Sequence, residues 1–98
     1  MKIHITLYGA MRVIAGQSNV ELSFDTPSVT LAQVIEALTA AYPRIRPYLL
    51  DASGALNTFL RILLNNQRPD PDVTLATTLH ANDRLVFLTP MAGGAASA

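Results

Sequence analysis

The strongest constraint on the fold is a single amphipathic helical stretch, "SVTLAQVIEALTAAYP" at residues 28–43, set between segments of alternating polarity. Thr30 stands three residues before Gln33, which is the spacing of a capping box. Apolar residues then recur at helical intervals, at Leu31, Val34, Ile35 and Leu38. The sequence therefore predicts one main helix that begins after Thr30 and ends before Pro43.

The segments on either side of this helix read as strands. Residues 2–8 and 19–24 alternate between apolar and polar side chains, and we expect them to form a hairpin, with a possible helical turn closed by Gly16 between them. "FLRILL" (59–64) and "RLVFL" (84–88) predict two further strands, and residues 73–80 a short edge segment. Residues 43–58 read as a turn or short helical piece and residues 65–72 as a loop. Asn82 suits a left-handed turn before the last strand. The expected class is α+β, a mixed sheet with the helix packed on one face.

The two-residue period of a strand assigns side chains to the two faces of this sheet. If the helix covers Ile3, Ile5 and Leu7, then Tyr8 points to the open face. The same alternation turns Leu85 and Phe87 inward. The outward residues that we expect to bind a partner are Tyr8, Phe59, Val86 and Leu88, together with Met91 beyond the last strand. The alternative is that a short hairpin or residues 43–58 fold over part of this face.

Composition excludes several functions. A chain of 98 residues forms one domain that is too small for a deep catalytic cleft, so we do not expect a stand-alone enzyme. The chain has no cysteine, seven basic and seven acidic residues, and no basic block, which argues against thiolate chemistry and nucleic-acid binding. We expect no bound cofactor or metal, because His4 and His80 are isolated and the "PDPD" aspartates suit a turn. No apolar stretch is long enough to span a membrane, and a cytoplasmic protein is the default expectation.

The pair Gly93-Gly94 follows the last strand within a few residues. Glycines lack Cβ atoms, so such a segment can pass through a narrow crevice into the active site of another protein. A free glycine carboxylate there could be adenylated with ATP, after which sulfide or a persulfide would displace AMP to give a thiocarboxylate, or an amine would give an amide. The tail would then be a tethered substrate that needs no catalytic residue in this chain.

Several of these segments together resemble a known family. The first strand with "YGAMRVIAG", the helix "TLAQVIEALTAAYP", the strand ending "ILLNNQ" and the closing "LHANDRLVFLTPMAGG" are similar to the ubiquitin-like sulfur carriers. The likeness is greatest to the small subunit of molybdopterin synthase and its thiamine-pathway relative, and it covers nearly the whole chain to Gly94. Its most specific part is the last strand, the proline and the Gly-Gly pair.

The resemblance implies a β-grasp domain over residues 1–90 and a flexible tail over residues 91–98. It implies that an E1-like enzyme adenylates Gly94, with Gly93 before it, and that a sulfurtransferase forms the thiocarboxylate. The sulfur would pass to the large synthase subunit or another acceptor, for molybdenum cofactor or related biosynthesis. It also implies that Tyr8 and Leu88 belong to the docking face.

The chain departs from the family pattern at three places. Asn82 replaces the usual glycine in the turn, and Thr89 a commoner proline. More important, "AASA" follows Gly94, so the glycine carboxyl is an internal amide and cannot be adenylated. Either a processing protease removes residues 95–98, or the extension is a remnant of cloning, or the chain has lost the chemistry. Two alternative functions therefore stay open, a β-grasp binding module and a ubiquitin-like protein modifier.

Overall fold

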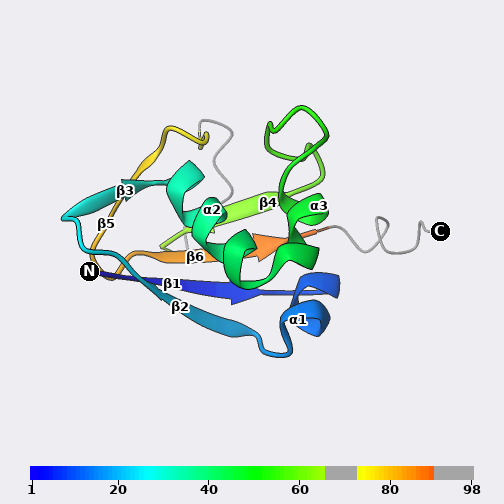
Figure 1. The fold of residues 1–98 in the computed structure, drawn as a ribbon, viewed down its shortest axis with the longest axis horizontal. Coiled ribbons are helices and arrows are strands. Elements are labelled where there is room, and N and C mark those ends of the chain that lie inside the picture. The colour runs from blue at the N-terminus through cyan, green and yellow to red at the C-terminus, as the bar shows by residue number, and fades with distance from the viewer. Residues whose placement is uncertain (66–72, 90–98) are drawn as a thin grey trace.

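The computed structural model describes residues 1–65 and 73–89 and contains a mixed four-stranded sheet (Figure 1). The strands are β1 (Lys2–Leu7), β2 (Asn19–Ser23), β4 (Arg61–Leu64) and β6 (Arg84–Leu88), in the order β2-β1-β6-β4. β1 pairs antiparallel with β2 and parallel with β6, and β4 pairs antiparallel with β6. The predicted α+β class and mixed sheet are confirmed.

A second, two-stranded sheet lies beside one end of the first. It consists of β3 (Ser28–Thr30) and β5 (Thr78–His80), paired antiparallel. The sequence did not predict β3, because three residues between Pro27 and a helix are too few to show a two-residue period. Their partner strand is about fifty residues away, so the pairing is set by tertiary contacts.

The predicted main helix is α2 (Leu31–Ala41), and its capping box is confirmed. The Thr30 hydroxyl accepts from the Gln33 N–H at 3.3 Å, and the Gln33 side-chain oxygen accepts from the Thr30 N–H at 2.8 Å. Shorter helices are α1 (Ala10–Ala15), the 3-10 helix η1 (Pro43–Ile45) and α3 (Arg46–Leu49). α1 ends as predicted at Gly16, whose φ of 77° is left-handed.

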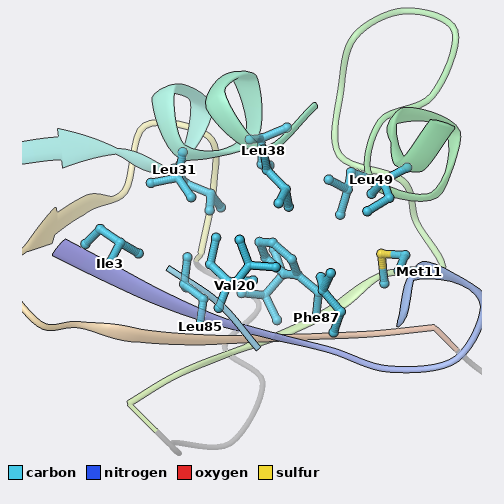
Figure 2. Close-up of a cluster of buried hydrophobic side chains, with 14 of the residues drawn as sticks. Ile3, Met11, Val20, Leu31, Leu38, Leu49, Leu85 and Phe87 are labelled. Carbon is cyan, nitrogen blue, oxygen red and sulfur yellow. The ribbon is translucent and has the colours of Figure 1, made fainter. Parts of the chain in front are cut away.

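The core lies between the sheet and the layer formed by α2 and α3 (Figure 2). Alternate residues of the central strands point into it, and Ile3, Leu7 and Phe87 have no exposed surface. α2 contributes the side chains at its helical intervals, Leu31, Val34, Ile35 and Leu38. These apolar positions are the ones that the sequence assigned to the interior.

One alternative and one prediction about residues 43–64 need correction. Residues 43–58 do not fold over the open face, because Ile45 and Leu49 are fully buried in the core on the side of α2. The strand predicted from Phe59 begins at Arg61 instead. The side-chain oxygen of Asn57 accepts from the Phe59 N–H at 3.0 Å, and its backbone oxygen accepts from the Leu60 N–H at 3.0 Å. The N–H groups of Phe59 and Leu60 are bonded within this turn, so the strand begins only after them.

Candidate functional site

The candidate site is built on the open face of the two central strands. In the parallel pairing of β1 with β6, Thr6 lies opposite Val86 and Leu7 opposite Phe87, so Tyr8 comes next to Leu88 one residue further along. Val86 and Leu88 are partly exposed while their neighbours Leu85 and Phe87 are buried, as alternation requires. This register brings together Tyr8 and Leu88, the two residues that the resemblance places on the docking face.

One end of the open face is apolar. On the other side of β6, Leu63 lies opposite Val86 and Arg61 opposite Leu88. Leu63, Val86 and Leu88 do not belong to the set of side chains packed against the core, and Tyr8 is 49% exposed. We call Tyr8, Leu63, Val86 and Leu88 the apolar patch. A partly exposed apolar cluster on a small sheet is typical of a protein-binding surface.

The other end of the same face is polar. The Glu21 carboxylate lies 3.4 Å from the Lys2 ammonium and 3.5 Å from Nδ1 of His4. A depression of about 260 Å³ lies there, lined by His4, Ile5, Thr6, Asn19, Val20, Glu21 and Arg84. Within residues 1–65 and 73–89, no group of three or more histidine or acidic side chains could hold a metal ion. The open face thus divides into a polar end and an apolar end.

The chain leaves β6 at the apolar end, next to an unusual glycine. Gly9 has φ 63° and ψ −139°, a backbone conformation that only glycine adopts readily. A Cβ atom at Gly9 would lie 3.6 Å from the Thr89 hydroxyl oxygen. The turn after β1 therefore touches the residue that follows β6. Neither strand period nor composition could have indicated this contact, because it depends on the parallel pairing of β1 and β6.

The turn that precedes β6 fixes the direction of that strand. Asn82 has φ 66°, as predicted for a left-handed residue, and its N–H donates to the Lys2 carbonyl at 2.7 Å. The Asp83 carboxylate accepts from the His80 N–H at 2.8 Å and from the Asn65 side-chain amide at 3.1 Å. Asparagine at position 82 thus supplies the backbone conformation that glycine would give.

The predicted binding residues fall into three groups. Tyr8, Val86 and Leu88 come together in the apolar patch. Phe59 is 63% exposed, but it lies in the turn before β4 and not on a strand. Met91, Gly93 and Gly94 lie outside the described residues, as does the boundary of the predicted tail. Leu63 lies opposite Val86 and also belongs to the patch, although the sequence analysis did not name it as a binding residue.

A mixed sheet crossed by one main helix, with an apolar patch beside the end of the last strand, defines a ubiquitin-like β-grasp protein. The family model described as the ThiS family matches residues 5–94. The chain belongs to this family of ubiquitin-like sulfur carriers. Small carriers of this kind are generally not catalysts themselves.

Solved structures agree with this assignment. CysO from Mycobacterium tuberculosis is 30% identical, with a TM-score of 0.73 over 89% of this chain and 97% of that one. SAMP1 from Haloferax volcanii is 21% identical, with a TM-score of 0.78 over 92% and 96%. A putative molybdopterin converting factor subunit 1 from Pyrococcus furiosus is 15% identical, with a TM-score of 0.70 over 92% and 98%. The last two likenesses show the fold alone.

No curated protein matches the chain in sequence. Among the helices of the described residues, none has the length and apolar character needed to cross a membrane.

Proposed function

We propose that this protein carries sulfur as a thiocarboxylate on Gly94 and is activated by an E1-like adenylating enzyme. The observation that carries the proposal is the position of the apolar patch beside Thr89, where the chain leaves β6. Gly94 lies five positions after Thr89, so a fully extended segment between them would span at most about 18 Å. A partner docked on the patch could therefore hold Gly94 in its own active site.

The chemistry requires a free carboxylate at Gly94. The carboxylate oxygen attacks the α-phosphorus of ATP and releases pyrophosphate, which leaves an acyl adenylate. Sulfide then attacks the glycine carbonyl carbon, the C–O bond to AMP breaks, and a thiocarboxylate remains. If a persulfide is the donor, its terminal sulfur attacks, and a thiol then reduces the acyl disulfide to release the thiocarboxylate. ATP is consumed by the partner and is not bound by this chain.

Removal of residues 95–98 belongs to the proposal, because Gly94 is bonded to Ala95 in the full chain. We propose that a protease of the kind that trims ubiquitin-like precursors makes this cut. Small side chains at Ala95 and Ala96 suit such a step. The acceptor would be a large synthase subunit of molybdenum cofactor biosynthesis or another enzyme that takes sulfur for a related product.

The direct test compares the full chain with a chain that ends at Gly94. Each is incubated with ATP, sulfide and the E1-like enzyme encoded in the same genome, and its intact mass is measured. We expect exchange of one carboxylate oxygen for sulfur in the shorter chain and no change in the full chain. If the shorter chain gains neither AMP nor sulfur, the proposal fails.

A protein modifier is the second candidate, favoured by the likeness to SAMP1, which is named a small archaeal modifier protein. A modifier would use the same adenylate but would transfer Gly94 to an amine and form an amide bond. Expression of a tagged chain in its own cells would then give a ladder of larger adducts whose lysines carry the Gly93-Gly94 remnant. A pure binding module would instead keep its partner affinity after Gly94→Ala.

A further inference from the structure

The described charges are unevenly distributed along the sheet. We call the end at which β1 and β6 finish the exit end, since the chain leaves β6 there beside Gly9. Arg61 opens β4 opposite Leu88, and Arg12 lies in α1 directly after β1. η1 packs against α1, and Arg44 lies in η1 and Arg46 at the start of α3 directly after it. Four arginines thus surround the exit end.

All four arginine side chains are exposed. None of them has an ion-pair partner among residues 1–65 and 73–89. The two ion pairs in this part of the chain are those of Glu21 with Lys2 and with His4. The guanidinium of Arg61 donates to the backbone oxygens of Thr58 at 3.2 Å and Leu60 at 3.4 Å, which holds it beside the apolar patch. No carboxylate of the described part of the chain neutralises these cations.

Most described acidic side chains lie away from the exit end. Glu21 pairs with His4 near the start of β1, Asp25 follows β2 at that same end, and Asp83 directly precedes β6. Glu36 lies in the middle of α2. Asp51, in the loop after α3, accepts from the Ser53 hydroxyl at 2.6 Å and from the Ser53 and Ala55 N–H groups. Although the formal charge of the whole chain is zero, the exit end is positive.

We infer that the partner which receives the tail is a protein whose docking surface has an apolar centre and a rim of carboxylates around the entrance to its active site. The apolar patch fits the centre, and the four arginines face the rim. A nucleic acid fits less well, because the chain as a whole has no net positive charge. This inference rests on the proposed function.

The physical consequence is electrostatic steering. Charges at the rim of an interface mainly raise the association rate and make it dependent on salt. They also orient the encounter, so that the exit end meets the partner first. A carrier with a short tail gains from this, because other orientations leave Gly94 out of reach.

The test measures adenylation of the chain ending at Gly94 by the E1-like enzyme of the same genome, through ATP–pyrophosphate exchange. Arg44→Gln with Arg46→Gln removes two positive charges at the exit end. The matched control, Lys2→Glu, changes the net charge by the same amount at the opposite end. Lys2, Arg44 and Arg46 are all exposed, so circular dichroism should show equal folding of the two variants.

We expect kcat/KM for the chain to fall about fivefold in the double variant and less than about twofold in the control at low salt. The difference in kcat/KM between the double variant and the control should disappear as the salt concentration rises from about 0.01 M to about 1 M, because the Debye length falls from about 30 Å to about 3 Å. Equal kcat/KM for the two variants overturns the inference and leaves the proposed function intact. If wild type is not adenylated at all, both are overturned.

A second arm separates the two kinds of partner. A fluorescent single-stranded RNA oligonucleotide is titrated with the wild type and with the double variant at low salt. We expect no binding that depends on Arg44 and Arg46. RNA binding that the double substitution abolishes would assign the arginines to nucleic acid and overturn the acidic-protein partner.

Discussion

The substitution Leu88→Ala separates docking from stability, because it changes the open face of β6 and leaves the core face intact. Leu88 is partly exposed on the open face, whereas its neighbour Phe87 is fully buried and points into the core. A leucine side chain that becomes fully buried contributes about 1.5–3 kcal/mol. Because part of Leu88 is already covered, we expect a loss of about 1–2 kcal/mol of binding free energy, which is about 5-fold to 30-fold in Kd.

Phe87→Ala is the matched control from the other face of the same strand. Removing a buried phenylalanine costs about 3–5 kcal/mol of unfolding free energy. For a domain of this size, each kcal/mol lowers Tm by about 4–8 °C, so Tm should fall by at least about 12 °C. Leu88→Ala, as a surface change of about 0.5 kcal/mol at most, should shift Tm by less than about 4 °C.

The assays are calorimetric titration of the E1-like enzyme with each variant, and thermal unfolding followed by circular dichroism. The reasoning is refuted if Leu88→Ala lowers Tm as much as Phe87→Ala does, because Leu88 would then be a core residue. It is also refuted if Leu88→Ala is stable but binds the enzyme with unchanged affinity, because the open face would then not be the docking surface.

Three further predictions concern the scaffold. Gly9→Ala should cost about 1–3 kcal/mol of unfolding free energy, because φ 63° with ψ −139° strains any residue with a Cβ atom; denaturant titration measures this, and an unchanged midpoint would contradict it. Thr30→Ala, which removes the cap of α2, should cost about 1 kcal/mol in the same titration, with Thr30→Ser as the neutral control. The hydrogen bonds from the Ser53 hydroxyl and N–H hold the pKa of Asp51 below its ordinary value. The ionised carboxylate therefore stabilises the fold at pH values above its unfolded-state pKa, and this stabilisation is lost as the pH falls through the folded-state pKa. NMR titration should find this pKa raised in Ser53→Ala, and an identical pKa in both proteins would argue against the turn.

Local patterns predicted those elements whose residues carry the signal themselves. The capping box of Thr30 and Gln33, the alternation of β1 and β6 and the left-handed Asn82 each depend on neighbours in sequence. The outward positions of Val86 and Leu88 follow from the same alternation, and their proximity to Tyr8 needed only a parallel pairing of the two strands.

The features that escaped the sequence depend on distant contacts. β3 is defined by its pairing with β5, and the start of β4 is set by the backbone bonds of the Asn57 turn. The fit of Gly9 against Thr89 joins residues that are eighty positions apart in the sequence. The positive exit end could not be seen in a chain of zero formal charge, because it arises when α1, η1, α3 and β4 bring four arginines to one end.

The pairing of β1 with β6 also bears on synthesis of the chain. His4 lies opposite Arg84, eighty residues later, and β6 occupies the position between β1 and β4 in the sheet. Contacts of such high sequence separation form late and slow the folding of a domain. Until β6 has left the ribosome and inserted, Tyr8 has no Leu88 beside it and the docking surface is incomplete. A nascent or truncated chain without β6 therefore lacks the apolar patch that the proposed docking requires.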